Sequence, residues 1–114
     1  MMSPEAVVDL QIEAFNRGDA DAFAAFYAEH AEISYPLSGD TPVHGREAIR
    51  DHYTAMFTAL PNLRASVAGR LVVGNVVTIH EHIPGIGAEA VATYAIVGGQ
   101  ISRAWLFGPI PTTA

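Results

Sequence analysis

The chain has 114 residues, of which 50% are hydrophobic and 16% are charged, and its formal net charge is -6. Its six basic residues are all arginines scattered along the chain, which excludes the clustered positive charge that nucleic acids and anionic membranes require. Cysteine is absent, so disulfides, thiol catalysis and thiolate metal sites are excluded, as is common for a cytoplasmic protein. We expect a single domain spanning residues 1–114, with a large apolar interior and no membrane span.

Three helices are predicted in the first 60 residues. The first has Ser3 as its N-cap and ends at Gly18. Asp19 can cap a second, shorter helix, whose buried stripe extends to Tyr27. A third helix is expected over residues 46–60, because apolar side chains recur there with helical spacing and a proline follows.

Beyond residue 61 the apolar residues alternate with a period of two, which indicates strands. We expect a four-stranded antiparallel meander, with a shorter strand at 31–35 ahead of a loop. The four meander strands are predicted at residues 63–73, 76–83, 89–97 and 100–107. This order favours an α+β fold in which helices cover one face of a curved sheet and enclose a pocket. The other face carries apolar residues such as Leu71 and Val91, so we expect a second copy of the chain to cover it.

Four stretches carry a resemblance to a known family. They are AFNRGD at 14–19, FYAEHA at 26–31, VHGREAI at 43–49, and residues 99–105. The chain resembles the SnoaL-like, nuclear transport factor 2-like superfamily over nearly its whole length. The resemblance implies a cone-shaped half-barrel, with three N-terminal helices packed in a curved antiparallel sheet around an apolar cavity, and usually a dimer. Relatives include ketosteroid isomerases, epoxide hydrolases, polyketide cyclases, dehydratases and proteins without catalytic activity.

The resemblance to ketosteroid isomerases shows which positions of this chain match their catalytic residues, but the residue types at those positions differ. Those enzymes place an Asp base directly before the proline that follows the first strand, and this chain has Tyr35 there. A phenol is a poor base at neutral pH, so we expect Tyr35 to donate a hydrogen bond to a substrate oxygen instead. The isomerases' tyrosine on the first helix corresponds to Gln11 or Phe15, and Glu89 is the one acid on the strand that carries their second Asp.

His80 and His82 match the positions of the Arg and Asp that limonene-epoxide-hydrolase-like relatives use two residues apart on one strand. Residues at i and i+2 of a strand share a face, so both imidazoles point into the cavity or both point away from it. In the second arrangement Glu81 lies inside and the histidines lie at the dimer face. A His-x-His pair is also typical of metal sites, with His44 or Glu89 as a third ligand. Because the rest of a known metal motif is missing, we expect neither a metal nor another cofactor.

The leading functional hypothesis is an enzyme that transforms a small hydrophobic molecule by acid–base chemistry, as an isomerase or as an epoxide hydrolase or cyclase. His80 or His82 would abstract or relay a proton, Tyr35 would polarise the substrate oxygen, and Glu89 would be the second acid. The alternative is a binding or dimerisation module of the same fold without catalysis. The residues expected to contact the ligand are Tyr53, Phe57, Tyr94 and Trp105.

Overall fold

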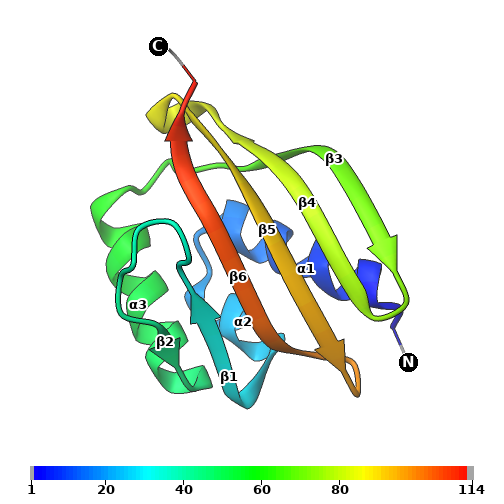
Figure 1. Cartoon of the computed structure of the whole chain (residues 1–114). Helices are drawn as coiled ribbons and strands as arrows, with labels where there is room; N and C mark the ends of the chain where they lie inside the picture. The colour runs from blue at the N-terminus through cyan, green and yellow to red at the C-terminus, as the bar shows by residue number, and fades with distance from the viewer. Residues whose placement is uncertain (1, 113–114) are drawn as a thin grey trace.

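The computed structural model describes residues 2–112, which form three helices and a six-stranded sheet (Figure 1). The helices are α1 (Pro4–Arg17), α2 (Ala20–Ala25) and α3 (Arg46–Ala59). The strands are β1 (Tyr27–Ser34), β2 (Val43–His44), β3 (Ser66–Val73), β4 (Val76–Ile83), β5 (Ala88–Val97) and β6 (Gln100–Pro111), with a short 3-10 helix, η1 (Pro84–Ile86), before β5.

The strands lie in the order β2-β1-β6-β5-β4-β3, and the three helices cover one face of the curved sheet (Figure 1). The largest hydrophobic cluster lies between these two layers and joins α1, α2 and α3 to the inner sides of the strands. The expected α+β half-barrel is therefore confirmed, including the antiparallel pairing of β3, β4, β5 and β6.

The starts of α1 and α2 lie where predicted, and at each a side chain accepts a hydrogen bond from a backbone N–H group that has no partner within the helix. The Ser3 hydroxyl accepts a hydrogen bond from the Ala6 N–H at 3.2 Å, and the Asp19 carboxylate accepts one from Ala22 N–H at 3.0 Å. Gly18 ends α1 with a φ of 67°, in the left-handed region that glycine adopts without a steric penalty. These caps explain why α1 begins and ends, and why α2 begins, where the sequence indicates.

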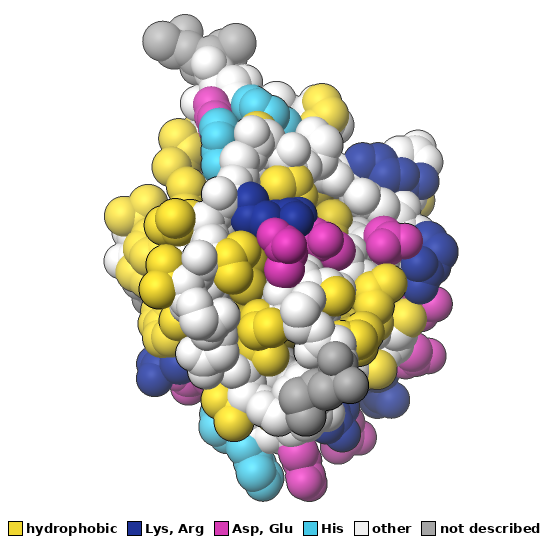
Figure 2. All heavy atoms as spheres, turned by 90° about the vertical axis from the view of Figure 1, so that its right-hand side faces the viewer, with side chains coloured by type: hydrophobic (Ala, Val, Ile, Leu, Met, Phe, Trp, Pro, Cys, Tyr) yellow, Lys and Arg dark blue, Asp and Glu magenta, His cyan; other side chains and the backbone are white. Residues whose placement is uncertain are grey.

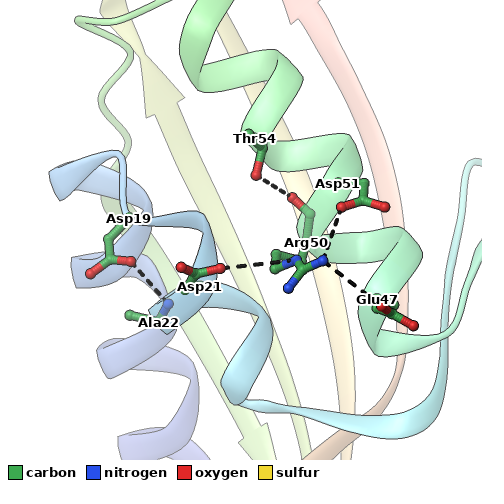
Figure 3. A network of polar contacts seen from close by, with 7 residues as sticks. All are labelled: Asp19, Asp21, Ala22, Glu47, Arg50, Asp51 and Thr54. Atoms are coloured by element: carbon green, nitrogen blue, oxygen red, sulfur yellow. Dashed lines mark hydrogen bonds and ion pairs between the residues drawn. The ribbon is translucent and has the colours of Figure 1, made fainter.

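Helices α2 and α3 are also linked by charge (Figure 3). Arg50 of α3 lies 3.9 Å from Asp21 of α2, and it contacts Glu47 and Asp51 of its own helix at 3.9 and 3.4 Å. Each of these exposed ion pairs contributes little stability by itself. The pair with Asp21 joins the two helices, whereas the pairs with Glu47 and Asp51 lie within α3.

The first strand begins earlier than predicted. Tyr27 does not extend α2 but opens β1, which runs from Tyr27 to Ser34. The strand is parallel to β6, with Ile33 opposite Ala104, so the sheet is mixed and not purely antiparallel. The expected helix was wrong at Tyr27 because local alanines favour a helix while the pairing with β6, about 70 residues away, decides the structure. Strand β2 is not predicted from the sequence pattern, and β3 begins at Ser66 instead of Leu63.

The outer sheet face, defined here as the side away from the helices, is rich in exposed apolar residues. Figure 2, which views the molecule from the side of β3, shows hydrophobic side chains gathered on the surface. The exposed residues of this face include Leu71, Val73, Val76, Val91 and Val97.

No helix within residues 2–112 is long and apolar enough to cross a membrane.

Candidate functional site

A cavity of about 180 Å³ lies between the helices and the inner face of the sheet. Its wall is mainly apolar, and it is built by all three helices, β4, β5, β6 and the segments around η1 and before β3. The apolar lining residues are Ile12, Phe15, Phe23, Met56, Leu60, Leu63, Ala65, Ile83, Ile86, Leu106 and Pro109. The polar lining residues are Gln11, Tyr53, Glu81 and Tyr94. A few polar groups in an apolar wall are typical of small-molecule sites.

Gln11 organises the polar part of the cavity. Its side chain is buried on α1, and its Oε1 accepts a hydrogen bond from the Tyr27 hydroxyl at 2.6 Å. The Gln11 Nε2 donates to the Val8 carbonyl at 3.5 Å, and Tyr94 of β5 lines the same cavity. The Gln11 amide therefore links α1 to the Tyr27 hydroxyl of β1 and holds that hydroxyl in place.

Glu81 is the carboxyl group of the cavity. On β4, the buried Val77 and Ile79 alternate with outward residues, and Glu81 continues their face toward the helices. Its cross-strand neighbours are Val67 on β3 and Ala90 on β5, and neither side chain can pair with a carboxylate. Burial raises the pKa of Glu81 to about 7, because an apolar wall disfavours the charged form. The carboxyl group can therefore both accept and release a proton near neutral pH.

The tyrosines beside Glu81 keep their protons. Burial raises the pKa of Tyr53 well above its ordinary value, and the pKa of Tyr94 is raised by burial and then by the negative charge of Glu81. Both hydroxyls therefore remain hydrogen-bond donors over the physiological pH range. The cavity combines one proton acceptor with neutral donors.

The prediction that His80 and His82 line the cavity is wrong. The structure places both on the outer sheet face, and Glu89 of β5 lies on the same face, opposite His82. The alternative orientation, with Glu81 inside, is the one found. The reason is the alternation of β4, which gives the inner face to Val77, Ile79 and Ile83.

The other predicted residues divide between the cavity and its surroundings. Tyr53 and Tyr94 line the cavity, whereas Phe57 packs behind the wall with its ring 5.3 Å from that of Phe15. Trp105 lies opposite Thr93 on the outer face, with the Arg103 guanidinium 5.2 Å from its ring centre, so its expected contact with the cavity is wrong. Tyr35 packs against the main core and is not part of the cavity wall. Its hydroxyl is buried and has no hydrogen-bond partner within residues 2–112.

Two of the polar lining residues, Glu81 and Gln11, are not among the predicted site residues, although one of the two orientations weighed for β4 places Glu81 inside and the resemblance places Gln11 or Phe15 at the position of the isomerases' tyrosine. A signal for Glu81 was present, because Val77 and Ile79 share its face and apolar residues mark the inner side of a strand. Gln11 had a weaker signal. It lies one residue before Ile12 on the apolar side of α1.

Comparison with known proteins supports the architecture. A family model described as a SnoaL-like domain matches residues 8–104. Among solved structures, a cystatin-fold protein from Novosphingobium aromaticivorans is 23% identical, with a TM-score of 0.82, and the match covers 93% of this chain and 98% of that one. A SnoaL-like protein from Burkholderia thailandensis is 21% identical, with a TM-score of 0.79 and coverage of 90% and 91%.

A third similar structure was solved with a small molecule. This protein from Catenulispora acidiphila has a ketosteroid isomerase-like fold and is in complex with trimethylamine. It is 18% identical to this chain, with a TM-score of 0.78, and the match covers 96% of this chain and 88% of that one. The search of curated proteins finds no match.

Proposed function

Because the chain belongs to the family of SnoaL-like domains, we propose that it binds a small, mostly apolar, oxygen-bearing molecule and transforms it by acid–base chemistry at Glu81. The observation that carries the proposal is the position of this carboxyl group in an otherwise apolar cavity, beside protonated tyrosines. His80, His82 and Glu89 have no part in this chemistry, since they lie on the other side of the sheet.

The size of the cavity limits the ligand. A volume of about 180 Å³ is below the roughly 300–1,000 Å³ of sites that hold drug-sized molecules. The substrate class that fits is therefore a compact molecule of one or two rings, or a short chain. Its apolar part would contact residues such as Phe15 and Met56, and its oxygen would lie near Tyr94 and Gln11.

The reaction that this set of groups favours is the shift of a double bond next to a carbonyl. The Glu81 carboxylate would take a proton from the carbon adjacent to the carbonyl, and the Tyr94 hydroxyl would donate a hydrogen bond to the oxygen as negative charge develops there. The protonated Glu81 would then return the proton to the far carbon of the conjugated system, so that no atom is gained or lost. Hydrolysis of an epoxide fits less well, because Glu81 is the single carboxyl group in the described wall.

Turnover of a small β,γ-unsaturated cyclic ketone tests this proposal, since the conjugated product absorbs in the ultraviolet. We expect Glu81→Gln to lower kcat by roughly 10²–10⁴-fold, because the amide keeps the shape of the side chain but cannot accept the proton. The matched control is Glu13→Gln, which changes an exposed acid on α1. Turnover of the Glu81→Gln protein at the rate of the control would contradict the assignment.

A second candidate function is binding of a small alkylammonium ion without catalysis. The observation that favours it is a carboxyl group surrounded by aromatic side chains, including Phe15, Phe23 and Tyr53, since a cation is stabilised by both. The Catenulispora acidiphila relative was solved with trimethylamine. Calorimetric titration with trimethylammonium chloride separates the two functions. Saturable binding that Glu81→Gln abolishes, without ketone turnover by the unaltered protein, would favour the binding module.

We also propose that the outer sheet face pairs with a second copy of the chain. Leu71 is 63% exposed there and Val97 is 62% exposed. In a two-fold symmetric dimer, this apolar patch would pack against the same patch of the second copy. Sedimentation of Leu71→Arg tests the interface, with Leu37→Arg as the control, because Leu37 is 65% exposed in a loop away from this face. We expect a dimer that Leu71→Arg dissociates and Leu37→Arg does not. A monomeric unaltered protein would contradict the proposal.

A further inference from the structure

Three metal-ligating side chains gather on the outer sheet face, which otherwise carries many apolar residues. His80 and His82 project from β4, and Glu89 projects from β5 at the position opposite His82. Figure 2 shows histidine and acidic side chains together at the upper end of the molecule, where β4 leads into η1 in Figure 1. This cluster lies outside the cavity and has no role in the proposed acid–base chemistry.

The three side chains converge on one point. One ligand atom from each of His80, His82 and Glu89 lies within 4.8 Å of the other two. The His80 Nε2 and the Glu89 Oε1 are already 2.6 Å apart, and the two imidazole rings have their centres 5.0 Å apart. In a tetrahedral zinc site, ligand atoms about 2.1 Å from the ion are roughly 3.4 Å from each other. Small rotations of the exposed side chains are sufficient to reach that spacing.

The backbone that carries the three side chains is held in place by the pairing of β4 with β5. Residues 80, 82 and 89 lie within the continuous antiparallel ladder between β4 and β5, so the three Cα positions are held by main-chain hydrogen bonds. The side chains are accessible, since His80 is 44% exposed and Glu89 is 38% exposed. In the single chain, an ion can therefore reach these side chains without any opening of the fold.

We propose that His80, His82 and Glu89 form a binding site for one Zn²⁺ ion per chain. Two imidazole nitrogens and one carboxylate oxygen are a ligand set that zinc prefers, and three protein ligands leave a fourth position open to water. The ion would take the place of the proton in the hydrogen bond between His80 and Glu89, and that proton passes to solvent. Because the site lies across the sheet from Glu81, the proposal does not rest on the function of the cavity.

Replacement of His82 distinguishes a zinc site from a simple ion pair between His80 and Glu89. The contact between His80 and Glu89 needs no third residue, so a pair without a metal gives His82 no role. A zinc site, in contrast, loses a ligand when His82 is replaced. The matched control is the second pair of neighbouring histidines, His30 and His44, whose ring centres are 6.5 Å apart.

Calorimetric titration of the tag-free, EDTA-treated full chain with ZnCl₂ tests the proposal, together with Co²⁺ absorption as a report of coordination geometry. We expect saturation at one ion per chain, an at least about tenfold weaker affinity for His82→Gln and for Glu89→Gln, and an unchanged affinity when His30→Gln and His44→Gln are combined. Zinc should also raise the Tm of the unaltered chain but not that of His82→Gln. Unchanged affinity in His82→Gln, or loss of binding in the His30 and His44 control, would overturn the assignment.

Discussion

Glu81 and His82 are adjacent in the chain and lie on opposite faces of the same sheet. The carboxyl group of Glu81 lines the cavity, whereas the imidazole of His82 lies on the outer face opposite Glu89. This separation follows from the two-residue period of a strand. Strand β4 therefore contributes to two separate groups of polar residues, one at the proposed acid–base site and one at the proposed metal site.

The stability of the protein should depend on the ionisation of Glu81. Its pKa is raised from 4.5 to about 7 in the folded chain, so folding favours the protonated form. The stabilising contribution is complete below about pH 4.5 and is lost as the pH rises through about 7. Urea unfolding in EDTA should show the free energy of unfolding of the unaltered chain falling, relative to Glu81→Gln, by at most about 3 kcal/mol between these limits. Parallel pH profiles for the two proteins would contradict burial of this carboxyl group.

Loss of the Gln11 amide should destabilise the fold. Gln11→Leu leaves the buried Tyr27 hydroxyl without its acceptor at 2.6 Å, and an unpaired buried polar group costs about 1–3 kcal/mol. Urea unfolding measures this loss. In a Tyr27→Phe background the same substitution should cost clearly less, because the orphaned hydroxyl is then absent. Equal costs in both backgrounds would show that the hydrogen bond contributes nothing.

Asn16 should be a stability determinant of the segment that leads into β3. Its Nδ2 donates to the Ala65 carbonyl at 2.9 Å, and its Oδ1 accepts from the Ala65 N–H at 2.7 Å, so one side chain satisfies both backbone groups of a buried residue. We expect Asn16→Ala to lower the free energy of unfolding by about 2 kcal/mol or more. Asn62→Ala, in the exposed turn after α3, is the control and should change it by less than about 0.5 kcal/mol. A cost no larger than that of the control would contradict this role.

Much of the fold follows from local patterns. Helices α1 and α3 are predicted by a capping residue, helical spacing and a terminating proline, all of which act over a few residues. The two-residue gaps between the predicted strands match the turns at Gly74-Asn75 and Gly98-Gly99. The strand that begins at Tyr27 depends on pairing with Ile101 and Arg103, far along the chain. Local propensity contains no information on that pairing, so the sequence pattern places the start of β1 too late.

The site was harder to predict than the fold. Alternation showed that His80 and His82 share a face and that Glu81 has the other, but both faces of this sheet carry apolar residues. The pattern alone therefore did not decide which group faces the helices. The homologous position of Tyr35 indicated a residue near the cavity, whereas in the structure its hydroxyl is buried against the core beside the wall.

The most direct test of the central claim is the exchange of α-hydrogens of a small cyclic ketone in D₂O, followed by NMR. Exchange requires only that a base in the cavity removes a proton from the bound ketone, so it reports on Glu81 even when the natural product is not formed. We predict that the unaltered chain accelerates exchange and that Glu81→Gln lowers this acceleration by about 10²-fold or more, while Glu13→Gln preserves it. Equal exchange with the unaltered and the Glu81→Gln proteins would contradict the claim that this carboxyl group is the base.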